Sequence, residues 1–395
     1  MKIVHLADLH LGFRQFQRLT PSGLNQRETD VAQSFKKAID SIIELEPDVI
    51  LIAGDVFHAV RPTNPAILQA YHHFQRLMQA LPDAIVVMVS GNHDTPRTVE
   101  TGSILRLFQN LGITVVETEA KSIFFEDRGL HVYAVPHDAV RDARFTPIAD
   151  AKYNVLLLHA EVEGVINRFS SVGARGTPDL TMRELGAEKW DYVALGHYHV
   201  YKSVAPNAWY AGATEYTSTN VWGEVDEQRE NNIPGKGFIE HNLETGEHHF
   251  HPISLSRTVI DIPEVSAEGL SAAQLSEAIA DAVEKCDGGI EDRIVRLIVR
   301  EVPRHILRDL DHRKIREYKR RALNFLLDAR RPVPVRIESA SGAPGRRASL
   351  TETVRTMLET RAVTPGIDRK ALVDLGLRYL EEVERLAPAS VGEDS

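Results

Sequence analysis

A short polar segment, Gly91-Asn92-His93-Asp94, carries residue types that can do chemistry. It follows residues 84–89, an apolar and mostly β-branched run that predicts a buried strand of a parallel sheet. Ligands of open α/β sheets gather where such strands end. An amide oxygen can ligate a metal, an imidazole can ligate or move a proton, and a carboxylate can orient that imidazole. Taken alone, the segment is equally well explained as a polar turn, because Gly-Asn pairs are common in turns.

The same arrangement recurs along the N-terminal half of the chain. Each of the predicted strands at 3–7, 48–53, 153–158 and 192–195 ends in residues that can ligate a metal, namely Asp8, His10, Asp55, His159, His197 and His199. Asp8 and His10 are spaced two residues apart, as are the last two histidines, so each pair points to one side of an extended chain. A single such residue is usually a turn residue or a satisfied histidine. Their recurrence at strand ends favours metal binding.

Together with Asn92, these residues form a mixed set of oxygen and nitrogen donors. The set exceeds the roughly four ligands of a zinc ion and suits two divalent ions that share a carboxylate. Imidazole with carboxylate favours manganese, iron or zinc over magnesium or calcium. Two ions about 3.5–4 Å apart form a clamp for in-line attack at phosphorus. His93 is left over, and with Asp94 behind it we expect it to stabilise the transition state or to protonate the leaving oxygen.

Length and composition indicate a soluble protein of more than one domain. The 395 residues allow at least one large core, and a hydrophobic content of 43% is ordinary for a globular chain. No apolar run of about 18 residues occurs, so no membrane span is expected. The N-terminus enters a strand directly and lacks the features of a signal peptide. Cys286 is the single cysteine, which excludes an intrachain disulfide and fits a reducing cytoplasm.

The formal net charge of −10 argues against a large basic surface for nucleic acid. It does not exclude a nuclease, because bound metal ions offset carboxylates where a phosphate sits. The polar segment 12–28 predicts a long loop at the carboxyl edge of the sheet, where substrate-contacting loops lie. The predicted DNA contacts are Arg14, Arg18 and Arg27 in this segment, with Arg61 and Arg97. A solvated surface loop explains any single arginine of the segment at least as well.

Residues 256–338 predict a small α/β domain. The pattern alternates strands and helices, at 257–261, 272–286, 294–299, 305–328 and 334–338. The second helix carries two basic runs, Arg313-Lys314-Ile315-Arg316 and Lys319-Arg320-Arg321. This face could track a phosphate backbone, and a solvated helix face is an equally good explanation.

Residues 339–349 have the composition of a flexible linker. Two short amphipathic helices follow, at about 350–359 and 369–386, within a segment 350–388 that precedes a tail at 389–395. Such a pair is too small to bury a core alone. We therefore expect a docking module for a partner, with packing back on the same chain as the alternative. No Gly-rich P-loop occurs, so any ATPase must be another protein.

The motif order Asp-x-His, Gly-Asp, Gly-Asn-His-Asp, His, Gly-His-x-His resembles the calcineurin-like metallophosphoesterase superfamily over residues 1–255. Within it, the segments Ala7-Asp8-Leu9-His10-Leu11-Gly12 and Gly54-Asp55-Val56-Phe57-His58 resemble the SbcD nuclease group. This group is the prokaryotic counterpart of the meiotic-recombination-eleven nuclease. The protein phosphatases of the superfamily carry Asp-Arg-Gly shortly after the second motif, and this chain has Phe57-His58-Ala59-Val60-Arg61 there instead.

The resemblance implies an α/β fold in which a β-sandwich flanked by helices carries the site, with 256–338 as a capping domain that closes over DNA. It implies one Mn²⁺ held by Asp8, His10, Asp55 and His199 and another held by Asp55, Asn92, His159 and His197. Fe²⁺, Zn²⁺ or Mg²⁺ are the alternative ions. His93 would be catalytic, and His58 would be a second catalytic or DNA-positioning histidine.

By the same resemblance, the helical segment 350–388 docks an SbcC-type, SMC-like coiled-coil ABC ATPase, and parts of 64–81 and 99–111 build a homodimer. The expected function is a manganese-dependent DNA exonuclease and endonuclease. It would be the nuclease component of an SbcCD-type double-strand-break repair complex, located in the cytoplasm with the nucleoid. One alternative is a phosphodiesterase for small or cyclic nucleotides, since the same ligands serve both. Another is a scaffolding protein that tethers DNA, although the complete ligand set argues against it.

Overall fold

Six strands form the sheet that carries the N-terminal motifs, in the spatial order β12-β11-β1-β2-β3-β4. Strands β1 to β4 run parallel to one another. Strand β11 pairs antiparallel with β1, and β12 pairs antiparallel with β11. Leu6 pairs with Ile52 and Ala53 pairs with Val89, so the carboxyl ends of β1, β2 and β3 meet at one edge. The bounds are β1 (Lys2–Leu6), β2 (Val49–Ala53), β3 (Ile85–Val89), β4 (Thr114–Val116), β11 (Gly237–Asn242) and β12 (His248–Pro252).

A second six-stranded sheet has the order β5-β6-β7-β8-β10-β9. Strands β6, β7, β8 and β10 run parallel, and β5 and β9 close its two edges antiparallel. His159 at the end of β7 pairs with Gly196 at the end of β8, so these two carboxyl ends also lie side by side. The bounds are β5 (Lys121–Phe125), β6 (Leu130–Val135), β7 (Tyr153–His159), β8 (Tyr192–Gly196), β9 (Lys202–Ala205) and β10 (Ala208–Tyr210).

The two sheets pack face to face through a shared apolar core. Leu51 of β2 and Val87 of β3 lie in one buried cluster with Leu157 of β7 and Ala194 of β8. Strands that bury both faces have continuous apolar sequences, which is the pattern of 49–53 and 155–158. The predicted α/β class, with sheets flanked by helices, is confirmed.

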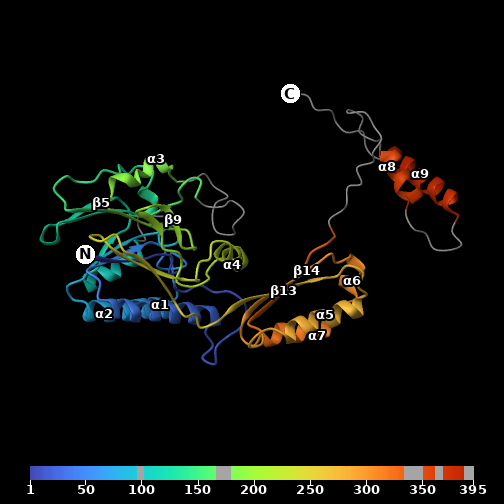
Figure 1. Ribbon diagram of the computed structural model, residues 1–395, viewed down its shortest axis with the longest axis horizontal. Coiled ribbons are helices and arrows are strands. Elements are labelled where there is room, and N and C mark those ends of the chain that lie inside the picture. The colour runs from blue at the N-terminus through green and yellow to red at the C-terminus, as the bar shows by residue number, and fades with distance from the viewer. Residues whose placement is uncertain (96–101, 166–178, 333–349, 361–367, 387–395) are drawn as a thin grey trace, which may run out of the picture. The chain divides into compact units, whose positions relative to one another are not determined.

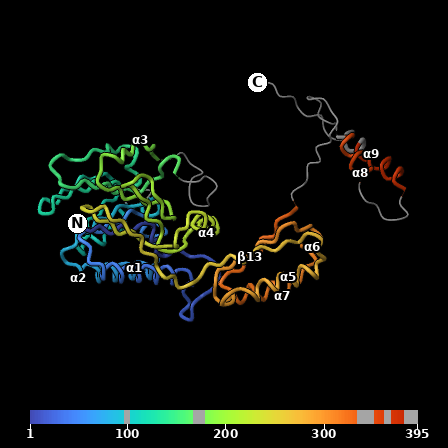
Figure 2. Tube along the Cα trace, in the orientation of Figure 1, coloured from blue at the N-terminus to red at the C-terminus, as the bar shows by residue number. Residues whose placement is uncertain are grey.

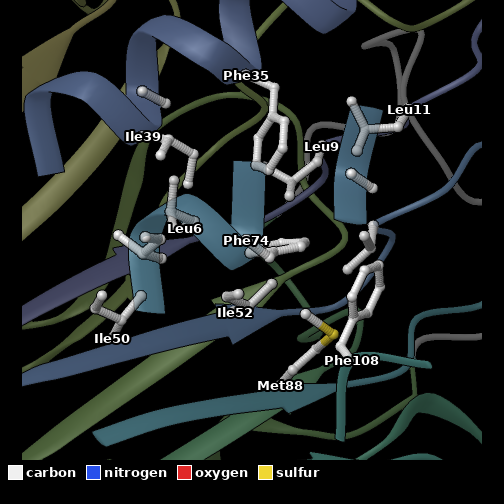
Figure 3. Packing of buried hydrophobic residues seen from close by; sticks show 14 of the residues in the cluster. Leu6, Leu9, Leu11, Phe35, Ile39, Ile50, Ile52, Phe74, Met88 and Phe108 are labelled. Carbon is white, nitrogen blue, oxygen red and sulfur yellow. The ribbon is translucent and has the colours of Figure 1, made fainter. Parts of the chain in front are cut away.

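Helices cover the outer face of each sheet (Figure 1). Phe35 and Ile39 of α1 and Phe74 of α2 pack onto Ile52 and its neighbours in the first sheet (Figure 3). Burying one such side chain contributes about 1.5–3 kcal/mol. The bounds are α1 (Gln26–Leu45), α2 (Asn64–Ala80), α3 (Met182–Leu185) and α4 (Val221–Glu230), with 3₁₀ helices η2 (Ile104–Leu111), η3 (Glu126–Arg128), η4 (His137–Ala139) and η5 (Ala187–Lys189).

Helix α1 begins before the end of the predicted loop 12–28. The Asn25 side chain accepts hydrogen bonds from the backbone N–H groups of Arg27 and Glu28, which is a stable helix start. Arg27 therefore belongs to the first turn of a helix, and a hydrophobic pattern that begins at Val31 did not reveal this start.

Residues 256–332 contain a third, three-stranded sheet with the order β13-β14-β15. All three strands are parallel, and α5 and α7 pack on one face through Leu275, Ile279 and Tyr318. The predicted continuous helix 305–328 is wrong. The chain breaks after α6, restarts at α7 where the Asp311 side chain caps the first turn, and forms β15. The bounds are β13 (Val259–Ser266), α5 (Ala272–Glu284), β14 (Ile294–Arg300), α6 (Arg304–Arg308), α7 (His312–Arg321) and β15 (Asn324–Ala329).

The computed structural model describes residues 1–95, 102–165, 179–332, 350–360 and 368–386. The chain divides into two compact units, Met1–Pro332 and Val333–Ser395 (Figure 2). In the second unit, α8 (Leu350–Thr360) and α9 (Arg369–Leu386) pack against each other near their predicted bounds. The predicted strand 334–338, linker 339–349 and tail 389–395 lie outside the described residues. Among the described helices, none combines the length and hydropathy that crossing a membrane requires.

Candidate metal centre

The loops that follow β1, β2, β3, β7 and β8 bring all the predicted metal ligands into one region. The backbone N–H of Asp8 donates to the Gly54 carbonyl (3.1 Å), which ties the loop after β1 to the loop after β2. Within the described residues, overlapping groups of ligand atoms lie within 4.8 Å of one another. They are Asp8, His10 and His199; Asp8, Asp55 and His159; and His10, His58 and His93.

The Asp55 carboxylate lies between two histidines from different sheets. Its Oδ2 is 3.6 Å from Nε2 of His10 and 3.5 Å from Nε2 of His159. On the first side, Nε2 of His10 is 2.9 Å from Nε2 of His199. This placement is what a carboxylate shared by two ions requires.

Asn92 lies on the other side of the Asp55 carboxylate, with His159. Its Oδ1 lies 3.0 Å from Nε2 of His159 and 3.1 Å from Nδ1 of His197. The site therefore joins the loop after β3 to the ends of β7 and β8. We refer to Asp8, His10, Asp55, Asn92, His159, His197 and His199 as the strand-end cluster.

The protonation of His159 tests whether a cation fits this cluster. Burial lowers the pKa of His159 to about 3, so the ring is neutral near pH 7. Its Nδ1 lies 2.9 Å from the Ala53 carbonyl oxygen, which can only accept, so Nδ1 carries the proton. The lone pair of Nε2 then faces the oxygens of Asn92 and Asp55. Nε2 of His159 and Oδ2 of Asp55 are both buried. Buried acceptors that face one another are costly unless a cation lies between them, so these residues fit a metal ion.

The charges of the cluster point the same way. Burial, together with repulsion between the two carboxylates, raises the pKa of Asp8 well above its usual value, and burial raises that of Asp55. Burial and the neighbouring imidazoles lower the pKa of His10 well below its usual value. The cluster thus sets the buried carboxylates of Asp8 and Asp55 against the neutral rings of His10 and His159, and a divalent cation would supply the missing positive charge.

The backbone of the cluster is held in an uncommon conformation. The φ angles of Asp8, His10 and Asp55 are 51°, 45° and 51°, and that of His197 is 104°. Left-handed backbone at non-glycine residues costs on the order of 1–3 kcal/mol each and tends to occur at functional sites. The surrounding hydrogen bonds, such as that from the His197 N–H to the Asp8 carboxylate (3.1 Å), hold the geometry.

Two glycines allow the loops to approach this closely. A Cβ atom at Gly196 would lie 1.7 Å from the Ala53 carbonyl oxygen, and one at Gly91 would lie 2.1 Å from Oδ1 of Asp55. Any side chain at either position would push apart the strand ends that carry the ligands.

His93 and His58 lie next to each other at the rim of the cluster. The Nδ1 of His93 donates to the His58 carbonyl (2.7 Å), and the two rings stack with centroids 5.1 Å apart. The backbone N–H of His93 donates to Oδ1 of Asp55 (2.8 Å). Both histidines are therefore anchored to the loop that carries the shared carboxylate.

Asp94 was predicted to lie behind the His93 ring, and the structure gives its carboxylate other partners. Its buried carboxylate accepts hydrogen bonds from the backbone N–H groups of Val56 (2.9 Å), Phe57 (2.9 Å) and Gly91 (3.3 Å). The His93 ring takes the His58 carbonyl as its partner instead. The reason is local geometry, because the turn 91–94 directs the two side chains to different neighbours. Asp94 ties the second and third motif loops together.

The predicted DNA-contacting arginines differ in their surroundings. Arg27 is buried and pairs with Asp30 and Glu215 (3.2 Å each), so its guanidinium offers no contact to DNA in this structure. Arg18 pairs with Asp292 (2.6 Å) in the third-sheet region. The remaining members are Arg14, which pairs with Glu28, Arg61, which is exposed, and Arg97, which lies outside the described residues.

Sequence reasoning missed His137 and Glu224. His137 lines a cavity of about 520 Å³ together with Asn92 and His93, and its ring centroid is 5.9 Å from that of His159. It follows the end of β6, so the strand-end pattern could have identified it. Glu224 lies on α4, with Oε1 3.6 Å from Nδ1 of His199. Nothing in the local sequence of α4 marks it, because its role depends on a contact between distant segments.

Residues 1–201 match the family model described as calcineurin-like phosphoesterase. The chain is 29% identical over 250 residues to the "DNA double-strand break repair protein Mre11" of Methanocaldococcus jannaschii, covering 60% of this chain and 61% of that protein. It is 26% identical over 229 residues to the SbcD component of the SbcCD nuclease of Staphylococcus epidermidis, covering 50% of this chain and 57% of that protein. The matched parts span about three-fifths of these relatives or less. The family model covers half of the chain, and the predicted resemblance is confirmed: the chain belongs to the calcineurin-like phosphoesterase family.

Proposed function

We propose that the chain is a metal-dependent phosphodiesterase that cleaves DNA, and that Mn²⁺ is its working ion. The observation that carries the proposal is the Asp55 carboxylate between His10 and His159, which is the arrangement that a two-ion phosphodiesterase needs. A cavity lined by Asn92 and His93 lies beside it and has room for a phosphodiester. The names of the Mre11 and SbcD relatives support DNA as the substrate.

The proposed ligand assignment follows the two sides of Asp55. Asp8, His10 and His199 would complete one ion site, and Asn92, His159 and His197 would complete the other. Bound ions would polarise the phosphate and lower the pKa of an attacking water. The chain's own residues fix the ligands in place and present the cavity lined by Asn92 and His93 next to both sites.

His93 is the proposed catalytic histidine. Its Nδ1–H is held by the His58 carbonyl, so Nε2 is left to exchange a proton with the leaving oxygen or to contact the phosphate. His58 stacks on this ring and is proposed to position it together with the DNA.

The wider assembly is also a proposal. Exposed Met357 on α8, and Leu375 and Tyr379 on α9, offer an apolar surface that would dock an ABC-type ATPase in double-strand-break repair. Leu68 on α2 is exposed and would contribute to a homodimer. The basic helix α7 in the 256–332 region would contact DNA as part of a cap, together with Arg14, Arg18, Arg61 and Arg97.

The testing experiment is digestion of end-labelled linear duplex DNA by the purified chain, with manganese, with magnesium and with chelator. We expect manganese-dependent release of nucleotides. Turnover of bis(p-nitrophenyl) phosphate without DNA cleavage would move the function to small phosphodiesters. DNA binding without turnover of either substrate would indicate a tethering protein.

A further inference from the structure

Helix α4 (Val221–Glu230) contacts the segment that carries His197 and His199. The Glu227 carboxylate accepts a hydrogen bond from the Tyr198 hydroxyl, between the two ligands. One turn earlier, Glu224 faces the ring of His199, with Oε1 3.6 Å from Nδ1. Both contacts come from residues of α4 that are buried.

Glu224 is held as a fully buried carboxylate by Lys236, which is itself buried. The ammonium group of Lys236 pairs with Oε2 of Glu224, so the buried negative charge is compensated. The same ammonium group donates to the His199 backbone carbonyl (2.6 Å). Lys236 therefore binds the backbone of the predicted ligand His199, and Glu224 lies next to its ring.

Two atoms at this contact lack hydrogen-bond partners within the described residues, namely Oε1 of Glu224 and Nδ1 of His199. They face each other a few tenths of an ångström beyond hydrogen-bond distance. Closing this gap would place the proton on Nδ1 and leave the Nε2 lone pair for a metal. Carboxylates that accept from the far nitrogen of a ligating histidine fix its tautomer and orientation in this way.

The other side of α4 contacts the third sheet. Arg296 of β14 donates to Asp226 of α4 (2.8 Å) and to Asp261 of β13 (2.6 Å), and its guanidinium lies over the Trp222 ring at 4.8 Å. Arg229 of α4 donates to the same Asp261 carboxylate (3.2 Å). The side chains of Arg296 and Asp261 are only 6% and 9% exposed, so salt screens this ion pair less than a surface pair, whereas Asp226 is 44% exposed.

We propose that Glu224 is a positioning residue for His199, and that α4 couples the placement of the third sheet to the metal centre. A shift of β13 and β14 is transmitted through Asp226 and Arg229 to the helix, and through Glu224 to the ligand. A substrate that contacts residues 256–332 would thereby alter metal affinity in the first sheet's site. The inference rests on the metal centre of the proposed function and extends it to regulation.

The first test measures Mn²⁺ binding to the full chain by calorimetry and by EPR, without nucleic acid. The variant Glu224→Gln/Lys236→Met removes both buried charges, so neither is left unpaired. We expect affinity to fall about 10–100-fold. The control Arg27→Met/Glu215→Gln removes another buried pair, and it should bind Mn²⁺ as the wild type does. Wild-type affinity in the Glu224 variant overturns the positioning role.

A second readout uses the metal-free protein and separates positioning from a general loss of structure. The ¹⁵N shifts of the His199 ring, identified by comparison with His199→Asn, should report a proton on Nδ1 in the wild type. In the Glu224 variant we expect a mixture of tautomers. An unchanged tautomer in that variant overturns the proposal.

The coupling is tested with two arginines of one strand. Arg296→Met cuts the link to α4, whereas Arg300→Met removes a pair with Glu264 that lies entirely within the third sheet. We expect Arg296→Met to weaken Mn²⁺ binding about 5-fold or more, and Arg300→Met to leave it unchanged. Equal affinities in the two variants overturn the coupling. Because no DNA is present, a chain that fails to cleave DNA would refute the proposed function and leave these results standing.

Discussion

Two histidine-rich regions of this protein draw residues from the same two sheets and differ in what surrounds their rings. One is the strand-end cluster. The other, which we call the aromatic histidine cluster, consists of His5, His241 and His248 with Tyr192, Tyr201 and Trp209. Burial lowers the pKa of His10 and His159 in the first cluster, and in the second it lowers that of His5 to about 3 and that of His248 to about 4. Burial therefore sets the protonation state without deciding the chemistry.

The neighbours decide the chemistry. The Tyr192 ring stacks on His241 at 4.6 Å, the Trp209 ring stacks on His248 at 4.0 Å, and the Tyr192 hydroxyl meets Nδ1 of His5 at 3.1 Å. In the described part of the chain, no ion pair joins these three histidines to a carboxylate. The strand-end cluster instead sets imidazoles against Asp8 and Asp55. Only the strand-end cluster carries negative charge for a cation to neutralise.

The largest effect is expected from Asp55→Asn, which removes the shared carboxylate from the strand-end cluster. We expect Mn²⁺ affinity to fall by more than about 100-fold, beyond the usual cost of losing an outer partner. Calorimetry with MnCl₂ measures it. If this variant still bound two Mn²⁺ ions tightly, the proposal that the carboxylates make the strand-end cluster a metal site would be wrong.

His93→Asn separates ligands from the proposed catalytic histidine within the strand-end cluster. We expect DNA cleavage to fall about 10²–10⁴-fold while manganese binding stays at the wild-type level, because general acid–base catalysis is lost and the ligands remain. Cleavage rates at saturating metal, paired with calorimetry, give the result. Unchanged cleavage would remove His93 from the mechanism.

His5→Ala probes the aromatic histidine cluster. The ring is fully buried, and its removal leaves a cavity and an unpaired Tyr192 hydroxyl, so we expect a loss of about 2–4 kcal/mol in unfolding free energy. Urea unfolding measures it, with the exposed His249→Ala on β12 as the control. Manganese affinity should be unchanged, and a drop in affinity would contradict the separation of the two clusters.

The smallest expected effect is on the pH dependence of the unfolding free energy, to which His5 of the aromatic histidine cluster contributes. The folded-state pKa of His5 is about 3, below its ordinary 6.5, so between these values the unfolded chain binds more protons and stability falls as the pH falls. His5→Phe removes this contribution, and in the metal-free protein we expect the slope from pH 6.5 to 4 to decrease by up to about 1.4 kcal/mol per pH unit. Urea unfolding across this range with chelator measures it. An unchanged slope would mean that His5 is protonated in the folded state.

The strand-end residues were predictable because continuous apolar runs, glycine and ligand-type side chains are all local signals. Asp8 lies just after β1 and His197 just after β8, and both strands are apolar runs of ordinary strand length. The break between α6 and α7 was not predictable from periodicity, because a basic amphipathic pattern continues through 305–321 and the cap at Asp311 competes with it locally. The burial of Arg27 was equally hidden, since its partner Glu215 lies far along the chain.

The sequence by itself determined the family, the strand order of the motifs and the identity of the proposed ligands, because these depend on residue type and short-range spacing. The tertiary structure alone decided that Asp94 holds backbone amides rather than the His93 ring, that Asp55 lies between His10 and His159, and that α4 links the third sheet to His199. Each of these depends on which distant segments the packing of the sheets brings within hydrogen-bond reach. No periodicity within a segment contains that information.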